Sequence, residues 1–308
     1  MIFMEISKSD VRADVLNAEA KMKGAKDDAK PEDRKAHAHK RREIYIGIVA
    51  VIIIAGVALA LISTPSPVVA DISMDGVQVN VTTLSQLKNI AMNETLANEV
   101  GIGVVSNPPV NSDTSTPLIV NGTPEIIYLG ANYCPFCAVT RWGLILALMR
   151  FGNFSVLRYM TSGTAVGEVY PGSPTFTFYN SNYSSTMIKF VPVEEETNNY
   201  TQLQTPTVFE DRLVNITDYN NPNVQALYKG GIPFIDFGNI SIQAAAPVSP
   251  AAIYRNTWNR VIANLSNVGT AQSQAIIGTA DVFTARICKM TGGQPIDVCS
   301  AAYVRKLS

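Results

Sequence analysis

The sequence predicts an α/β domain behind one transmembrane helix, and three stretches of the chain lead to that prediction. From Ile44 to Ile62 every residue is apolar, glycine or tyrosine. Residues 126–142 have the pattern of a strand, a tight turn with two cysteines, and a helix with apolar residues at helical spacing. Residues 230–242 have the pattern of a strand entered through a proline, a Gly-Asn turn and a returning strand. After the cysteine-bearing helix, Phe154 to Met160 has the pattern of a further strand, and strand, helix and strand in succession are typical of a parallel βαβ unit.

The run from Ile44 to Ile62 has nearly the length of about 20 residues that a helix needs to cross a bilayer. Seven basic residues lie between Lys26 and Arg42, and none follows the run until Lys88. This asymmetry places the N-terminus in the cytoplasm and the C-terminal domain outside the cell membrane. A cleaved signal peptide ending near Ala70 is the alternative, but the apolar run and the arm before it are too long for that class of segment.

The predicted organisation has four parts. Residues 1–43 form a solvated cytoplasmic arm, 44–62 the signal anchor, 63–117 a linker with an N-terminal extension, and 118–308 the exterior domain, with an insertion at about 161–228. The extension contains a helix over about 84–99 with Thr83 as its N-cap. His37 and His39 could bind a metal, but Lys40, Arg41 and Arg42 beside them favour a basic cluster at the membrane.

The Cys134-Pro135-Phe136-Cys137 turn carries the chemistry that the sequence predicts. The free N–H groups and the positive dipole end of a first helical turn stabilise negative charge on Cys134. Two intervening residues bring Cys137 within bonding distance, so that the pair can open and close as a disulfide. Pro135 suits the helix start because its missing N–H would have had no partner there.

Cys288 and Cys299 form a second pair by sequence, and a structural disulfide is the predicted role. A closed loop of this size stabilises a fold by about 3 kcal/mol. A second redox pair that relays electrons to Cys134 and Cys137 is the alternative. Zinc held by all four sulfurs is disfavoured, because Cys288 and Cys299 have the wrong spacing and an exterior site competes with oxidation. We therefore expect no metal and no cofactor.

Asparagine sequons are more frequent after the apolar run than composition alone would give, which predicts a glycosylated exterior face. The candidate acceptors are Asn80, Asn93, Asn121, Asn153, Asn182, Asn199, Asn215, Asn239 and Asn264. A surface rich in Asn and Thr with accidental sequons is the alternative interpretation.

Several function classes lack the residues they require. No histidine follows residue 39, so a Ser-His-Asp triad, a Cys-His protease and a His-bearing zinc hydrolase are excluded for the exterior domain. No glycine-rich phosphate loop and no basic aromatic patch occur, so nucleotide and nucleic-acid partners have no support.

With the Cys134–Cys137 turn and the Ile232-Pro233-Phe234 strand both identified, the chain resembles thioredoxin-fold proteins. With the anchor and the C-terminal cysteine pair included, it is more closely similar to a family of uncharacterised archaeal membrane-anchored thioredoxin-like proteins. The resemblance implies that Cys134 is the attacking thiol, Cys137 the resolving thiol, and Pro233 a cis residue that shapes a substrate groove. The neighbours that would line this groove are Tyr133, Pro135, Phe136 and Ile232.

The sequence departs from the thioredoxin pattern at Tyr128, where a buried aspartate is usual. A proton acceptor for Cys137 is therefore missing or supplied by Glu125, Glu168 or Asp236. We expect a membrane-anchored thiol–disulfide oxidoreductase that acts on the thiols or disulfides of secreted or surface proteins, with an unidentified redox partner. The alternative is a glycosylated cell-surface structural or assembly protein in which Cys134 and Cys137 form a static disulfide on a thioredoxin scaffold.

Overall fold

The computed structural model describes residues 70–112, 116–215, 220–226 and 228–307. The predicted cytoplasmic arm at 1–43 and the predicted membrane anchor at 44–62 lie outside these ranges. The prediction of a single-pass membrane protein with an extracellular domain is corrected here, because no described helix has both the length and the apolar character needed to cross a membrane.

The strand that leads to the cysteines, β3 (Thr123–Gly130), lies at the centre of a six-stranded mixed sheet. Along one edge β3 pairs antiparallel with β7 (Phe234–Phe237), which continues through β8 (Ser241–Ala244) to the short β1 (Val110–Asn111). Along the other edge it pairs in parallel with β6 (Lys189–Glu194), while β2 (Ile119–Val120) forms a hairpin with its first residues. The last six residues of β3 are all buried, as expected for a strand covered on both faces.

The strand after the motif helix does not occupy the predicted position. β4 (Asn153–Thr161) pairs antiparallel with β5 (Pro174–Ser184) in a separate two-stranded sheet, whereas the parallel neighbour of β3 is β6. Buried residues alternate with more exposed ones along β4, which suits a strand with one face toward solvent. The position next to β3 in the central sheet, by contrast, is covered on both faces. The predicted βαβ unit is therefore wrong.

The predicted fold class, a thioredoxin-like fold with an N-terminal extension, a β/loop insertion and one preceding transmembrane helix, is wrong as well. The described chain is a mixed α/β domain without a membrane-spanning helix. The predicted insertion at 161–228 contains β5, β6 and α6 (Val208–Val214), and β6 belongs to the central sheet. That stretch is thus part of the core architecture.

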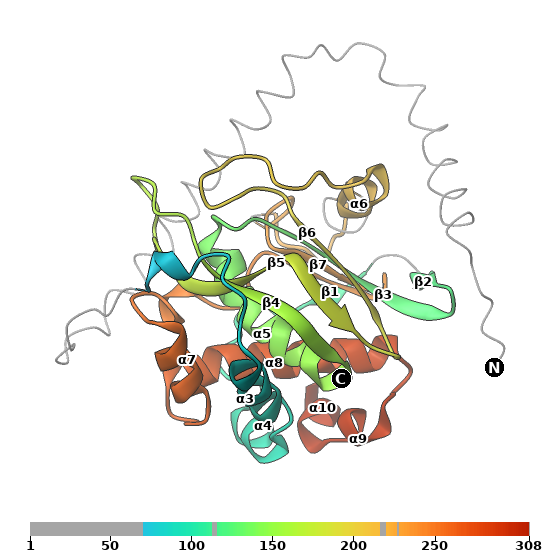
Figure 1. Cartoon of the computed structure of the whole chain (residues 1–308). Helices are drawn as coiled ribbons and strands as arrows, with labels where there is room; N and C mark the ends of the chain where they lie inside the picture. The colour runs from blue at the N-terminus through green and yellow to red at the C-terminus, as the bar shows by residue number, and fades with distance from the viewer. Residues whose placement is uncertain (1–69, 113–115, 216–219, 227, 308) are drawn as a thin grey trace, which may run out of the picture. The chain divides into compact units, whose positions relative to one another are not determined.

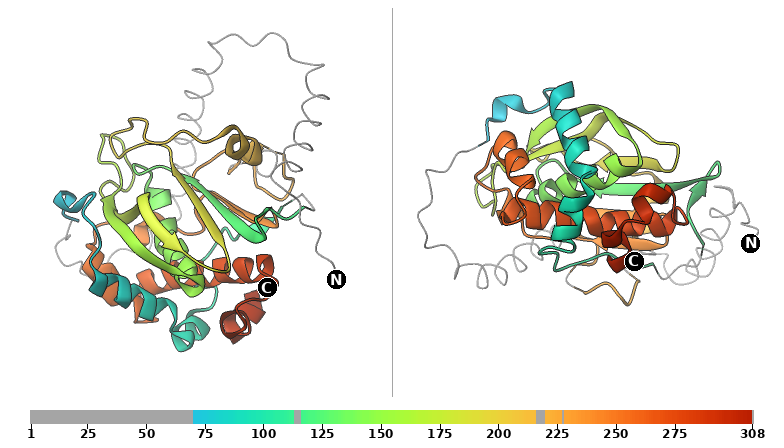
Figure 2. Two further views of the ribbon diagram at one scale, coloured as in Figure 1. Left: turned by 45° about the vertical axis from the view of Figure 1, so that its right-hand side comes forward. Right: turned by 90° about the horizontal axis from the view of Figure 1, so that it is seen from below.

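The motif helix α5 (Pro135–Phe151) is buried along almost its whole length and packs against α8 (Ala271–Met290). Figures 1 and 2 show most of the helices gathered on one side of the sheets, with α6 on the other side. The same helical layer includes α7 (Trp258–Leu265), α9 (Ile296–Cys299) and α10 (Ala302–Leu307). Of the 3-10 turns, η5 (Pro250–Ala252) contacts α5 and α8, whereas η3 (Ile72–Met74) contacts β4.

The predicted helix over 84–99 is two helices, α3 (Val81–Ala91) and α4 (Glu94–Val100). The Asn93 side chain accepts a hydrogen bond from the backbone N–H of Leu96 and so begins a new helix. The N-cap of α3 is Asn80 rather than the predicted Thr83, because the amide oxygen of Asn80 accepts from the N–H of Thr83. Leu87, Ile90 and Leu96 join the main hydrophobic core, so the extension packs on the domain.

The β7–β8 hairpin turns at Gly238 and Asn239, which both have positive φ (64° and 57°). This is the backbone that a Gly-Asn pair favours in a tight hairpin. Cys288 and Cys299 are joined by a disulfide with a Cα–Cα distance of 5.4 Å. The bond ties the last turn of α8 to α9.

A glycine sets the separation of the two central helices. A Cβ on Gly143 of α5 would lie 2.4 Å from Cγ2 of Thr279 and 3.3 Å from the carbonyl oxygen of Ile276, both on α8. We expect Gly143→Ala to lower the free energy of unfolding by about 1–2 kcal/mol in chemical denaturation, since overpacking outweighs the better helix propensity of alanine.

Gly269→Ala is the matched control. Its added methyl would meet only Oδ1 of Asn267 within contact range, at 3.5 Å. We expect a change within about 0.5 kcal/mol for this variant. Equal stability changes at the two positions would show that α5 and α8 do not need the close approach at Gly143.

Candidate functional site: a buried cysteine pair

Cys134 is the N-cap residue of α5, and Pro135 occupies the first helical position. The sulfur of Cys134 accepts a hydrogen bond from the backbone N–H of Cys137 at 3.2 Å. The local sequence explains this geometry: β3 ends at Gly130, and the turn 131–133 delivers Cys134 to the helix start. Both cysteines are free thiols in this structure.

The cis peptide bond between Ile232 and Pro233 lies beside the cysteines. The Cys134 thiol approaches the carbonyl oxygen of Ile232, with an S···O distance of 3.9 Å. Ala131, Cys134 and Cys137 form a small buried cluster, against which Tyr133, Phe136 and Ile232 pack. The structure therefore brings together the residues that were predicted for the cysteine site and its groove.

The Cys134 sulfur is more enclosed than the groove prediction implies, because Cys134 is 1% exposed and Cys137 is 0% exposed. Aromatic rings surround the pair. Tyr133 lies against Tyr200 with ring centroids 4.5 Å apart, and Phe136 meets Tyr170 edge to face at 6.5 Å. The hydroxyl of Tyr200 bonds to Glu168. Segments near residues 170 and 200 thus contribute to the surroundings of the motif turn.

An ion pair that sequence reasoning missed lies next to Cys137. Arg141 follows Cys137 by four residues on α5, and Glu194 ends β6. Nε of Arg141 donates to Oε1 of Glu194 at 2.9 Å, and Nη2 donates to Oε2 at 2.6 Å. Both side chains are fully buried. Nη2 also donates to the carbonyl oxygen of Ala131 at 2.6 Å, so the pair holds the turn that carries the cysteines.

Tyr128 completes this buried group. Its ring lies 5.9 Å from the guanidinium carbon of Arg141. A Cβ on Gly130 would lie 2.2 Å from the Tyr128 hydroxyl, so glycine leaves room for that side chain. Burial raises the pKa of Tyr128 well above its usual value, and Arg141 lowers it in part. The phenol is therefore protonated at neutral pH.

Burial also raises the pKa of the Cys137 thiol well above its usual value. The hydrogen bond with Cys134 and the charge of Cys134 raise it further, whereas the positive charge of Arg141 lowers it. For Arg141 itself, burial lowers the pKa, but Glu194, Tyr128 and Cys137 together raise it above its ordinary value. Arg141 is thus a permanent positive charge whose field reaches Cys137.

The three predicted proton acceptors have other partners. Glu125 pairs with Lys189 at 2.6 Å, and Glu168 bonds to Tyr200. Asp236 accepts a hydrogen bond from the backbone N–H of Asn239 at 2.5 Å, in the β7–β8 hairpin. The carboxylate linked to the cysteine turn, through Arg141, is Glu194. An acidic residue at a strand end and a basic residue on the motif helix were visible in the sequence, but not their pairing.

Most predicted sequon asparagines are exposed, and several have structural roles. Asn80 and Asn93 cap helices, and Asn215 donates to the carbonyl oxygen of Asp211. The side chains of Asn239 and Asn264 are half-buried and hydrogen-bonded within the domain. The other exposed candidates are Asn121, Asn153, Asn182 and Asn199. Glycosylation of these sites stays a prediction.

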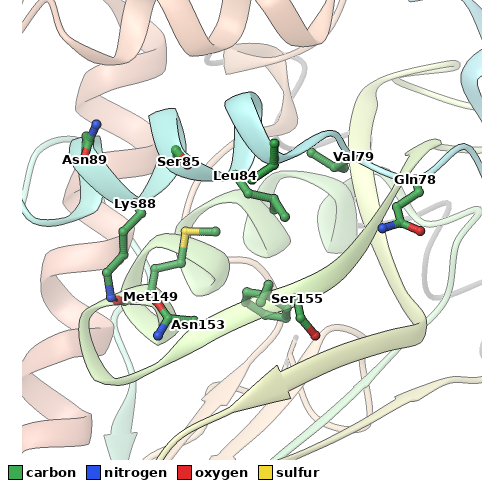
Figure 3. Close-up of a pocket in the computed structure, with 11 residues that line it drawn as sticks. Gln78, Val79, Leu84, Ser85, Lys88, Asn89, Met149, Asn153 and Ser155 are labelled. Atoms are coloured by element: carbon green, nitrogen blue, oxygen red, sulfur yellow. Dashed lines mark hydrogen bonds between the residues drawn. The ribbon is translucent and has the colours of Figure 1, made fainter.

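A hollow between α3 and β4 is separate from the cysteine site. Figure 3 shows Lys88 reaching across it from α3, with Met149 and Asn153 nearby. The ammonium group donates to the carbonyl oxygens of Met149 and Gly152, so it caps the end of α5. Within the described ranges, no three His, Cys, Asp or Glu side chains come together as a metal-binding group.

Fold and site define this chain as a mixed α/β protein with a buried vicinal dithiol at the start of its central helix. It belongs to the family described as a domain of unknown function, DUF929, whose pattern matches residues 112–289. That span includes the cysteine pair, Arg141, Glu194 and the Ile232–Pro233 peptide. No curated protein and no solved structure matches the chain. The resemblance to archaeal membrane-anchored thioredoxin-like proteins stays a prediction.

Asp236 gives the domain a testable pH dependence. Burial raises the pKa of its carboxyl from 3.8 to about 7, against the lowering effect of the Asn239 N–H. A raised folded pKa means that Asp236 favours the folded state when protonated. That contribution is complete below about pH 4 and is lost as the pH rises through about 7.

We expect Asp236→Asn to remove this loss while keeping an oxygen that accepts from the Asn239 N–H. From about pH 5 to about pH 8, the free energy of unfolding of the wild type should fall relative to the variant by about 2–3 kcal/mol. Denaturant unfolding at several pH values measures this difference. The exposed Asp297→Asn should keep the wild-type pH dependence. Parallel curves for wild type and Asp236→Asn would contradict a neutral buried Asp236.

Proposed function

We propose that this protein is a thiol–disulfide oxidoreductase that acts on protein thiols or disulfides through Cys134 and Cys137. The observation that carries the proposal is the arrangement of Cys134 at the N-cap of α5, with the Cys137 N–H donating to its sulfur and the Ile232 carbonyl beside it. A helix start offers N–H groups that stabilise a thiolate.

In the proposed reaction the Cys134 thiolate attacks a substrate disulfide and forms a mixed disulfide, while one substrate sulfur leaves as a thiolate. Cys137 then attacks the Cys134 sulfur. The internal disulfide forms and the second substrate sulfur leaves, so the substrate gains the two electrons that the dithiol loses. The reverse sequence oxidises a substrate dithiol.

Because Cys134 is 1% exposed, a protein substrate reaches its sulfur after the surrounding side chains move. Tyr133 and Phe136 are neighbours of the cysteine in sequence, while Tyr170 and Tyr200 belong to the segments beyond β4 and β6. These aromatic rings cover the cysteine turn through non-covalent contacts only. Loop segments open at a smaller free-energy cost than core strands, so movement of these segments can expose the Cys134 sulfur.

Trapping of the mixed disulfide tests the proposal. Cys137→Ala removes the resolving thiol, so we expect it to accumulate a covalent complex with an unfolded, disulfide-containing test protein on a non-reducing gel. Cys134→Ala, the matched control, should give no complex because the attacking sulfur is gone. Identical behaviour of the two variants, with no complex in either, would overturn the proposed reaction.

The burial of both sulfurs favours a second candidate, a structural or assembly protein whose Cys134–Cys137 pair is a static bond after oxidation. The reduction potential separates the two functions. A static structural bond has a potential below about −300 mV, whereas an exchanging pair lies within the range of redox-active dithiols. Equilibration of the wild type in thiol buffers of graded potential gives this value.

A further inference from the structure

Arg141 is placed to act on the thiol of Cys137. The two residues are four apart on α5, and side chains at this spacing lie one above the other on the same face of a helix. The guanidinium is fully buried beneath the cysteine turn. Its Nε and Nη2 donate to Glu194 and Ala131, whereas Nη1 has no hydrogen-bond partner among the described residues.

The hydroxyl of Tyr128 is a second donor in the same place. It is buried and has no hydrogen-bond partner in the described part of the chain. Electrostatic interactions couple it to Arg141, Glu194 and both cysteines. Both donors lack acceptors in the described structure, and both groups interact electrostatically with Cys137, so a negative charge on that sulfur would be favoured. Unpaired buried donors are otherwise costly.

We propose that Arg141 is a positioning residue for the resolving step, in which its guanidinium stabilises the thiolate of Cys137 and Glu194 limits how much of that charge the sulfur experiences. This inference rests on the proposed function. It adds the group that makes a buried resolving thiol reactive.

The chemistry of the resolving step defines the need for a positive charge. Cys137 attacks as a thiolate, so its proton leaves to water before the Cys137–Cys134 bond forms and the substrate sulfur departs. Burial opposes this ionisation. Glu194 is poorly placed to accept the proton, because its two oxygens already accept from Arg141 and from the backbone N–H of Phe178. Ionisation of the Cys137 thiol is favoured instead by a nearby cation.

Charge changes in the ion pair should therefore affect Cys137 in opposite directions. Glu194→Gln keeps the shape and a hydrogen-bonding oxygen but removes the compensating negative charge. Arg141→Met removes the positive charge, and Arg141→Lys keeps it. If the ion pair had a purely structural role, Glu194→Gln and Arg141→Met would change the titration of Cys137 in the same direction, since each breaks the same buried pair.

The first measurement is the pH titration of the Cys137 thiolate by ultraviolet absorbance, in a Cys134→Ser background that leaves Cys137 as the single unpaired cysteine. We expect the midpoint to move to lower pH in Glu194→Gln, to higher pH in Arg141→Met, and to stay near the parent value in Arg141→Lys. If Arg141→Met does not fold, the direction of the midpoint shift in Glu194→Gln still tests the role of Arg141.

The second measurement is the release of thionitrobenzoate from a mixed disulfide on Cys134, with Cys137 present. Near neutral pH we expect release to be about tenfold faster in Glu194→Gln and about tenfold slower in Arg141→Met, because the rate follows the thiolate fraction. The pH profile of each variant should shift with its titration midpoint.

The Arg150–Asp281 pair is the matched control. This pair is also buried and joins Arg150 of α5 to Asp281 of α8 at 2.7 Å, and Arg150 bonds Ala91 and Thr284 rather than the cysteine turn. Asp281→Asn should leave the Cys137 midpoint unchanged. A Glu194→Gln midpoint that stays fixed or moves to higher pH would overturn the role of Arg141. The titration needs no substrate, so its result does not depend on the trapping experiment. If Cys137→Ala traps no complex but the midpoints shift as expected, the proposed function is rejected and the effect of Arg141 on Cys137 is not.

Discussion

The buried ion pair of Arg141 and Glu194 connects the elements that make the cysteine site. Arg141 belongs to α5, and Glu194 ends β6 in register with Gly130 of β3. Glu194 also accepts from the N–H of Phe178 in β5, and Arg141 donates to the Ala131 carbonyl in the motif turn. Removing either charge would leave the other buried without compensation, at a cost of about 3–5 kcal/mol. Helix, two strands and turn are thus fixed relative to one another by a single pair.

This constraint bears on why β6 lies beside β3. Paired in parallel, the two strands end together, so the last residue of β6 lies level with the turn that carries Cys134. Glu194 is then within reach of a helix residue one turn below Cys137. β4 ends its own antiparallel pairing at Thr161 opposite Pro174 and contributes no carboxylate to this position. The order of strands therefore determines which charges surround the thiols.

Sequence reasoning anticipated the parts of this molecule that depend on neighbouring residues. The strand, Cys-x-x-Cys turn and helix over 126–142, and the Gly238–Asn239 hairpin, follow from local periodicity and turn chemistry. One prediction failed and one contact was missed, because both needed tertiary information. The pairing of β3 with β6 depends on which strand fits a site buried on both faces, and the Arg141–Glu194 contact joins residues 53 apart. The break at Asn93 was a local signal, since an asparagine in an otherwise helical run can begin a new helix.

Enclosure of the thiols and the presence of a cation beneath them are linked by the same electrostatics. Burial protects a dithiol from unwanted oxidation, but it also disfavours the thiolate that exchange requires. An arginine with its full charge exposed to the sulfur would strongly offset the effect of burial on the thiolate. An arginine fully neutralised by a carboxylate would not offset it. Glu194 binds two of the guanidinium nitrogens and leaves Nη1 without a partner in the described structure. The site therefore combines a low-dielectric enclosure with a partly compensated charge, and under the proposed function this combination favours the thiolate that Cys137 needs for exchange.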